Sequence, residues 1–379
     1  MGAGPYSLRS ADQTAFSLSD LKKGVFFAHK QGVKVYLAMN IFSYDSDLPK
    51  MINYLKKAIT IGIDAVIVTD PGLVYLIRKI NKKIKIHLST QANTLNSSAV
   101  KFWKEQGVSR IVLGRELTLK QVNFIRKAVP NIELELFIHG AMCMSYSGRC
   151  LLSKHMTGRS ANRGDCTHPC RWEYTIKEAK REDEEFRIEE DPRGTYILNS
   201  KDLCLIEHIP ELVKAGINSF KIEGRMKSVY YVAVVAKIYR EALDSYLSNP
   251  KKYKYDPKWK EELQKISHRN YTTGFYFGDT DRENIKGSEY VRDHAFVGVV
   301  GKHSSLGLEV FGRNRFAKGD DLEIIDPNAK EIITFKVKSI KQGDDYLQKA
   351  HNGYHVMVEG TLPHKVSQYS LLRKRINNA

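Results

Sequence analysis

The chain has 379 residues, and its 42% hydrophobic and 27% charged residues are ordinary for a globular protein. This length allows two or three domains with a sizeable core, and no apolar run is long enough to span a membrane. The 60 Lys and Arg residues exceed the 43 Asp and Glu residues, so the formal charge is +17. The excess favours an anionic partner such as a nucleic acid, although a solvated lysine surface explains it equally well. Nothing near residue 1 resembles a signal peptide, so we expect a cytoplasmic protein.

The first half of the chain alternates short apolar runs with amphipathic stretches. Five runs predict strands, at residues 33–39, 65–68, 84–88, 110–113 and 134–138. Between the strands, apolar residues recur at helical spacing, most clearly after Ser46 and after Thr118. This alternation indicates parallel strands joined by crossover helices.

Two further units of strand and helix follow. We expect a strand at residues 196–198 with a helix at 203–215, and a strand at 219–222 with a helix at 228–247. The resulting seven strands are one fewer than a closed barrel of the TIM type contains. An open sheet would also fit, but residues 1–9 read as a loop that follows a strand. The sequence therefore predicts an α/β fold for residues 1–285, a TIM-type (β/α) barrel that lacks its first strand.

Near residue 290 the pattern changes to short alternating runs broken by Gly and Asn. Six runs predict antiparallel strands, at residues 296–300, 308–311, 321–325, 332–340, 355–358 and 370–373. We expect a small antiparallel β barrel over residues 290–379, with a basic run at 373–375 that suits nucleic acid. An acidic connector at residues 178–193 holds seven carboxylates within ten positions, and a solvated linker is its simplest explanation.

Four of the five cysteines follow the strand at 134–138, within a loop at residues 139–174. They are Cys143, Cys150, Cys166 and Cys170, separated by six, fifteen and three residues. A disulfide scaffold, a redox pair and unrelated buried thiols all fit this pattern less well than a metal site does. Zinc usually takes tighter ligand pairs, whereas a 4Fe-4S cluster needs four thiolates and accepts irregular spacing. The spacing therefore favours an iron-sulfur cluster, whose negative charge nearby arginines such as Arg159 and Arg163 would offset.

The same loop resembles a known family. Glu135, Phe137 and the runs 140–143 and 148–150 are similar to the signature of the collagenase-like peptidase family U32. Residues 160–174 resemble the transfer-RNA hydroxylation branch of that family, and the similarity continues in the runs 199–203, 220–225 and 268–275. It thus covers nearly the whole chain. In that family a strand and a helix precede a Tyr-Ser-Leu-Arg run like the one at residues 6–9.

Despite the peptidase name, the resemblance implies an oxygenation enzyme. Members of this branch are associated with an iron-sulfur cluster and with prephenate-dependent hydroxylation of the wobble uridine of tRNA to 5-hydroxyuridine. The implied partners are tRNA and prephenate, a small dicarboxylate, with a second subunit of the same family as a further partner and no membrane. A hydroxylase of ribosomal RNA, a collagenase-like peptidase and a non-catalytic RNA-binding module remain alternatives. The sequence contains no nucleophile elbow, His-Glu-x-x-His motif or Gly-rich nucleotide fingerprint.

Polar residues gather where the predicted strands end, and the carboxyl ends of parallel strands build the active site of such a barrel. Arg115 and Arg225 are candidates to hold prephenate carboxylates, and an ion pair with Glu116 or Glu223 is the alternative for each. His139 is a candidate proton shuttle, although a histidine that is merely hydrogen-bonded at a strand end is more common. We assign these five residues to the catalytic set.

The predicted substrate-binding residues fall into two groups. The first group lies at the same strand ends and comprises Asn40, Gln91, Asn93 and Lys221. The second lies in a stretch where lysines alternate with Tyr and Trp, as suits RNA, and comprises Lys251, Lys252 and Lys254. A solvated helix start explains the second group equally well.

Overall fold

The computed structural model describes residues 2–7, 16–142, 150–169, 172, 176–177, 185–186, 201–224, 227–278, 291–329 and 331–376. The chain forms two compact units, of which the first comprises Met1–Met226 with Asn270–Ser288 and the second Lys227–Arg269 with Glu289–Ala379. The strand expected at 196–198 and the loop expected at 8–9 lie outside the described residues, as does most of the acidic connector. The boundary expected between residues 285 and 290 stays a prediction.

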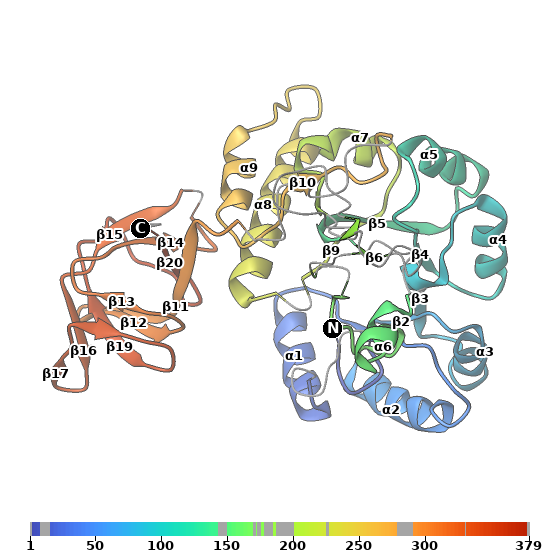
Figure 1. Ribbon diagram of the computed structural model, residues 1–379, viewed down its shortest axis with the longest axis horizontal. Helices are drawn as coiled ribbons and strands as arrows, with labels where there is room; N and C mark the ends of the chain where they lie inside the picture. The colour runs from blue at the N-terminus through green and yellow to red at the C-terminus, as the bar shows by residue number, and fades with distance from the viewer. Residues whose placement is uncertain are drawn as a thin grey trace. The chain divides into compact units, whose positions relative to one another are not determined.

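A parallel sheet forms the centre of the first unit (Figure 1). Its strands pair in the order β1 Tyr36–Met39, β2 Ala65–Val68, β3 Lys85–Leu88, β4 Arg110–Val112, β5 Glu133–Ala141 and β9 Ser219–Ile222. The helices that precede or connect the first five strands are α1 Leu18–Lys30, α2 Leu48–Ile61, α3 Pro71–Ile80, α4 Ser97–Glu105 and α5 Leu119–Ala128. The predicted parallel strands and crossover helices are thus confirmed in this part of the chain.

Local sequence explains why the helices begin and end where they do. Helix α2 turns Met51, Leu55 and Ala58 inward, and none of the three has exposed surface. Gly62 ends this helix with φ of 102°, in the left-handed region that favours glycine. Asp70 begins α3 by accepting a hydrogen bond from the backbone N of Leu73 at 2.8 Å.

The parallel sheet is strongly curved. The guanidinium of Arg110 on β4 lies 5.4 Å from the ring centre of Tyr36 on β1, although two strands separate β1 from β4. Arg110 also donates to Ser219 Oγ on β9 at 3.3 Å. Side chains of these three strands meet because the sheet bends around them. The first unit is therefore a mixed α/β structure built on a curved parallel sheet, while the closed TIM-type barrel stays a prediction.

The chain after residue 200 departs from the sequence prediction. Asp202–Cys204 forms strand β8, antiparallel to β5, and only then do η4 Ile206–His208 and helix α7 Ile209–Lys214 follow. The helix predicted to begin at residue 203 is thus wrong in its first part. The carboxyl end of β5 offers backbone hydrogen bonds there, such as Leu205 N to Ile138 O at 3.0 Å, and a short buried apolar run satisfies either structure. Strand β10, Tyr271–Thr272, then pairs with β8 in parallel.

An antiparallel sheet and two helices make up the second unit. The strands lie in the order β15 Ile333–Lys336, β14 Asp321–Ile325, β20 Leu371–Arg375, β11 His294–Ser304, β12 Gly307–Gly312, β19 His355–Glu359, β16 Ser339–Gln342 and β17 Asp345–Tyr346. The helices are α8 Val229–Ser248 and α9 Pro257–Gln264. The antiparallel arrangement is confirmed, and closure into a barrel stays a prediction. The run expected as one strand at 332–340 forms two, because Val337 N donates to Asp320 O and Lys338 N to Glu359 O, on different neighbours.

Arg373 joins the helices of this unit to its strands. Its side chain has no exposed surface, and Nη2 lies 2.6 Å from Glu323 on β14 and 2.8 Å from Glu262 on α9. Nη1 donates to Tyr230 Oη on α8 at 3.2 Å. Lys374 pairs with Asp320 at 2.9 Å. The basic run at 373–375 is therefore largely engaged in ion pairs, which corrects its interpretation as a surface for nucleic acid.

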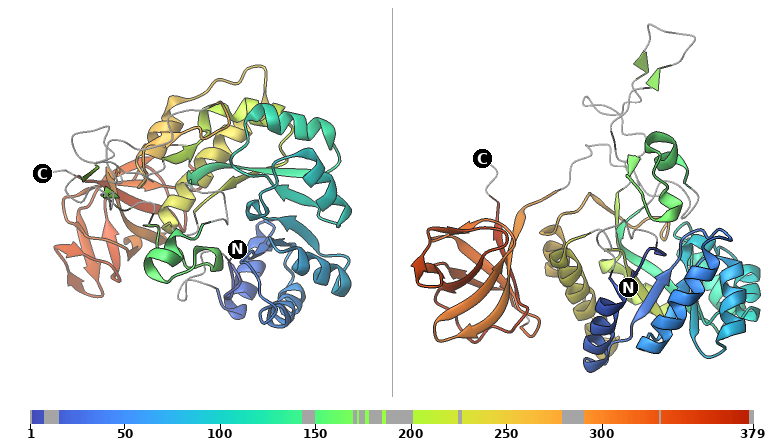
Figure 2. Two further views of the ribbon diagram at one scale, coloured as in Figure 1. Left: turned by 45° about the vertical axis from the view of Figure 1, so that its right-hand side comes forward. Right: turned by 90° about the horizontal axis from the view of Figure 1, so that it is seen from below.

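Shorter elements complete the described part of the chain, and among them the green helix α6 can be seen in Figure 2. They are η1 Thr90–Ala92, α6 Leu152–Thr157, η2 Ala161–Arg163, β6 Ile176–Lys177, β7 Glu185–Phe186, β13 Phe316–Ala317 and β18 Lys349–Ala350. Strands β6 and β7 pair with each other, as do β13 and β18. None of the helices within the described residues has both the length and the apolar character needed to cross a membrane.

Candidate functional site

Arg115 lies buried just beyond the carboxyl end of β4. Only 6% of the residue is exposed, and its Nη1 donates to the backbone oxygen of Ala141, the last residue of β5, at 3.0 Å. The guanidinium lies 5.2 Å from the ring centre of Phe137 on β5. This contact holds a cation at the strand end that leads directly into the cysteine loop.

Glu116 and Tyr276 share this environment. Glu116 Oε2 is buried without a hydrogen-bond partner among the described residues, so this oxygen does not form the alternative ion pair with Arg115. Tyr276 Oη donates to the backbone oxygen of Phe137 at 3.1 Å. Burial raises the pKa of Tyr276, against an opposing effect of Arg115. The phenol therefore stays a neutral hydrogen-bond donor, and the sequence analysis did not assign it to the site.

His139 lies on β5, two positions beyond Phe137, and only 1% of it is exposed. Its ring centre is 5.4 Å from that of Tyr271 on β10. The next residue, Gly140, has φ of 113°, and a Cβ atom there would come within 2.4 Å of the backbone oxygen of Glu223. Glycine is required because the backbone after β9 approaches β5 this closely. The structure thus brings together His139 and the backbone of Glu223, while Arg225 lies outside the described residues.

The predicted amide side chains gather at the ends of β1 and β3. Asn40 Nδ2 donates to Ser89 Oγ at 3.3 Å, which joins the two strand ends. Asn93 has φ of 49°, and its Nδ2 donates to the backbone oxygen of Gln91 at 3.3 Å. Gln91 Oε1 is buried without a hydrogen-bond partner among the described residues. The folded chain thus brings Asn40, Gln91 and Asn93 to one region, as predicted from the strand ends.

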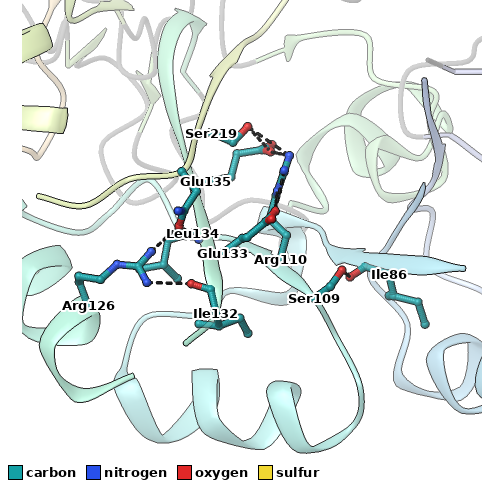
Figure 3. A network of polar contacts seen from close by, with 10 residues as sticks. Ile86, Ser109, Arg110, Arg126, Ile132, Glu133, Leu134, Glu135 and Ser219 are labelled. Atoms are coloured by element: carbon teal, nitrogen blue, oxygen red, sulfur yellow. Dashed lines mark hydrogen bonds and ion pairs between the residues drawn. The ribbon is translucent and has the colours of Figure 1, made fainter. Parts of the chain in front are cut away.

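A buried polar network, which the sequence analysis did not identify, lies nearer the amino ends of the same strands (Figure 3). Arg110 Nη2 lies 2.6 Å from Glu133 Oε2, and its Nη1 lies 3.2 Å from Glu135 Oε2. Ser219 Oγ donates to Glu135 Oε2 at 2.8 Å, and Lys221 Nζ lies 3.4 Å from Glu135 Oε1. Two glutamates at alternate positions, Glu133 and Glu135, at the start of an otherwise buried strand were the available signal.

The contacts of this network determine the ionisation of Glu135 and His87. Burial opposes ionisation of Glu135, but Lys221, Ser219 and Arg110 outweigh it and hold the pKa of that carboxyl below its usual range. Burial, together with the Arg110 cation, lowers the pKa of His87 on β3 to about 4. Lys221 also lies 5.2 Å from the ring centre of Phe137, the ring that Arg115 contacts. Two cations therefore flank one aromatic side chain of β5.

Of the four predicted cluster ligands, the structure describes two. Cys150 and Cys166 are both partly exposed, whereas Cys143 and Cys170 lie outside the described residues, so the ligand set stays a prediction. Cys166 Sγ accepts a hydrogen bond from the backbone N of His168 at 3.4 Å, and His168 has φ of 56°. A backbone N–H directed at sulfur favours a thiolate, so this local geometry fits a cysteine that binds iron.

Two arginines near these cysteines, Arg159 and Arg163, are already paired. Arg159 Nε donates to Asp165 Oδ1 at 2.7 Å, and Arg163 Nη1 lies 2.9 Å from Asp47 Oδ2. Arg163 also donates to the backbone oxygen of Phe42 at 3.0 Å. These contacts tie η2 to the segment between β1 and α2. The expected use of Arg159 and Arg163 to offset cluster charge is therefore weakened, because each already neutralises a carboxylate.

Comparison with known proteins places the chain in a family. A family model described as peptidase family U32 matches residues 1–286, and one described as peptidase family U32 C-terminal domain matches residues 292–373. The chain belongs to peptidase family U32. The resemblance identified from the cysteine loop is thereby confirmed.

Relatives of this U32 chain carry different names. The tRNA hydroxylation protein P of Escherichia coli is 37% identical over 93% of this chain and 86% of its own length. The tRNA hydroxylation protein P1 of Bacillus subtilis is 36% identical over 99% of this chain and 89% of its own length. A protein of Porphyromonas gingivalis named Collagenase is 32% identical over 93% of this chain and 86% of its own length. The two hydroxylation proteins are thus similar along nearly the whole U32 chain.

The predicted RNA-binding lysines belong to the second unit of the U32 chain. Lys251, Lys252 and Lys254 are exposed in the turn between α8 and α9. The aromatic residues of this stretch pack against one another, since the rings of Tyr253 and Trp259 stack with centres 6.2 Å apart. These rings therefore support the turn, and their predicted use as stacking surfaces for bases stays a prediction.

Proposed function

We propose that this protein is a tRNA hydroxylase that converts the wobble uridine to 5-hydroxyuridine, with prephenate as co-substrate and a 4Fe-4S cluster as cofactor. The observation that carries the proposal is the similarity to tRNA hydroxylation proteins over nearly the whole chain. A match of this extent includes both compact units, so it exceeds the similarity expected from a shared fold alone.

The strand-end residues support a small anionic co-substrate. Arg115 and Lys221 place two cations within 5.2 Å of the Phe137 ring. Lys221 already contacts Glu135, so Arg115 is the stronger candidate to attract a carboxylate in these buried surroundings. Arg115 can hold one carboxylate by two hydrogen bonds, which an ammonium group cannot reproduce. The neutral phenol of Tyr276 donates its one hydrogen to the backbone oxygen of Phe137 at 3.1 Å, which helps to hold β5 in place beside these cations.

The cysteine loop supports the proposed cluster. Cys143, Cys150, Cys166 and Cys170 would hold it, and the hydrogen bond from His168 N to Cys166 Sγ suits a thiolate ligand. When bound, such a cluster supplies one-electron transfer chemistry. The residues of this chain contribute the binding and orientation of substrate, with His139 proposed to hold or move a proton at an imidazole nitrogen.

Nucleoside analysis tests the proposal directly. We expect 5-hydroxyuridine to disappear from the tRNA of cells that lack this protein and to return when the intact gene is restored. Unchanged tRNA together with a missing hydroxylation in ribosomal RNA would move the activity to that other RNA. Unchanged nucleosides in both RNAs would contradict the proposal.

Peptidase activity is the second candidate, because one relative is named Collagenase. A gelatin-cleavage assay on purified protein, with and without removal of bound iron, separates the two candidates. We expect no cleavage in either state. Cleavage that persists after iron removal would favour the peptidase.

A further inference from the structure

We propose that a pocket in the second unit binds the phosphodiester backbone of RNA. The pocket has a volume of about 430 Å³, and its polar lining residues are Lys302, His303, Lys365, Ser367 and Gln368. The choice of RNA as the ligand rests on the proposed function, and the pocket itself rests on the contacts described below.

The pocket forms where the end of β11 passes the segment that leads into β20. Two backbone hydrogen bonds hold these segments together, from Tyr369 N to Val300 O and from Val300 N to Ser370 O, each at 2.8 Å. Gly301, Lys302 and His303 follow Val300 on one side. The pocket is therefore lined by segments that the sheet itself holds in place.

The orientation of His303 makes it a hydrogen-bond donor to the pocket. The backbone N of Val366, which is 2% exposed, donates to His303 Nδ1 at 2.8 Å. Nδ1 is therefore an acceptor, and the proton of the neutral imidazole lies on Nε2. Lys302 and Lys365 provide further donors that carry positive charge, and neither has an ion-pair partner among the described residues.

Neither of two nearby acidic residues competes for these donors. The Glu309 carboxylate, which lies beside Gly301, pairs with His355 Nε2 at 2.7 Å. Asp326, which is 3% exposed, accepts hydrogen bonds from Ser367 N at 2.7 Å and from Asn328 N at 2.8 Å. These bonds hold the pKa of its carboxyl below the usual range, although burial opposes them. The Asp326 carboxylate thus holds the backbone at Ser367 in place. Lys302 and Lys365 stay available to bind an anion.

Paired charge reversals test the pocket. We expect Lys302→Glu with Lys365→Glu to weaken tRNA binding at least tenfold and to lower the salt dependence of the affinity by about one to two units, one for each lost phosphate contact. The control is Lys336→Glu with Lys349→Glu, which changes the same charge on β15 and β18 and should have a clearly smaller effect. Fluorescence anisotropy at several salt concentrations gives both quantities. Equal losses in the two variants, or no loss in the first, would overturn the proposal.

A further variant separates binding from folding. His303→Asn keeps an acceptor for Val366 N and removes Nε2, so binding should weaken while the melting temperature stays close to that of the parent. Parent-like binding in this variant would contradict the proposed contact.

The binding measurements do not depend on hydroxylation, so the two proposals can fail separately. Nucleoside analysis decides whether tRNA is modified, and anisotropy decides whether the pocket binds RNA.

Competition with polyglutamate tests the ligand class: we expect polyuridylate to displace tRNA at much lower concentration than polyglutamate. The reverse order would assign the pocket to an acidic peptide and overturn the RNA proposal.

Discussion

Cys204 on β8 lies directly opposite His139 on β5 in the antiparallel pairing of these strands. The two residues are 7% and 1% exposed. Cys204 therefore takes part in packing within the sheet, whereas the other four cysteines belong to the loop at 139–174. We therefore expect variants of Cys204 and variants of the loop cysteines to differ in iron content.

The first prediction concerns iron. Anaerobically purified protein should contain about four iron atoms per chain, and serine at Cys143, Cys150, Cys166 or Cys170 should lower both the iron content and the visible absorbance. Cys204→Ser is the matched control and should keep its iron. Full iron content in Cys170→Ser, together with loss in Cys204→Ser, would replace one ligand in the proposed set.

The second prediction concerns the buried network. Glu135→Gln should destabilise the protein by about 3 to 5 kcal/mol, because it leaves Arg110 and Lys221 without their buried carboxylate. Glu133→Gln changes the other carboxylate that Arg110 contacts, but 46% of that side chain is exposed, so the loss should stay below about 1 kcal/mol. Urea denaturation at neutral pH compares the two. Similar losses would show that burial of Glu135 does not determine its contribution.

The third prediction concerns pH. The His294 imidazole and the Arg373 guanidinium lower the pKa of Glu323 from 4.5 to about 2. Because the folded-state pKa is the lower one, this carboxylate stabilises the fold above pH 4.5, and the contribution is lost as pH falls toward 2. It amounts to about 3 kcal/mol at neutral pH.

Glu323→Gln should therefore reduce the dependence of unfolding free energy on pH within this window. Glu309→Gln serves as the control, because Glu309 pairs with His355, whose side chain is 56% exposed. Equal pH dependence in the parent and Glu323→Gln would refute the prediction.

The fourth prediction concerns the proposed co-substrate. Arg115→Ala should weaken prephenate binding by roughly thirty- to several-thousand-fold, as expected for about 2 to 5 kcal/mol from a buried charged contact, and should abolish hydroxylation. Arg115→Lys should be nearly as impaired but can still donate to Ala141 O, so its fold should be preserved. Arg225→Ala should resemble Arg115→Ala. Unchanged affinity by titration calorimetry in all three would leave Arg115 as a structural donor only.

The fifth prediction concerns the exposed turn of the second unit. Replacing Lys251, Lys252, Lys254 and Lys258 together by Gln should weaken tRNA binding and flatten its salt dependence by about one unit for each lost phosphate contact. Replacing four exposed lysines of α1 and α2, namely Lys22, Lys23, Lys56 and Lys57, is the control. An unchanged slope in the first variant would exclude this turn from the RNA surface.

The sequence by itself determined the family, the parallel strands of the first unit and the antiparallel strands of the second. The family follows from the resemblance of the cysteine loop and the later runs. The strands follow from local periodicity, since an apolar face recurs at every second residue in a strand and about every 3.6 residues in a helix. The grouping of four cysteines after β5 was also visible in the sequence, because the strand and its loop are adjacent in the chain.

Only the tertiary structure decided which polar residues are buried and which residues they contact. Arg110 and Ser219 are 109 positions apart, and Arg373 meets Tyr230 across 143 positions. From residue type alone, Arg373 was predicted to be an exposed cation. The short apolar run at 203–206 fitted a helix as well as the strand β8. A charged side chain can be buried only when folding supplies its partners, so its environment depends on contacts that local sequence does not contain.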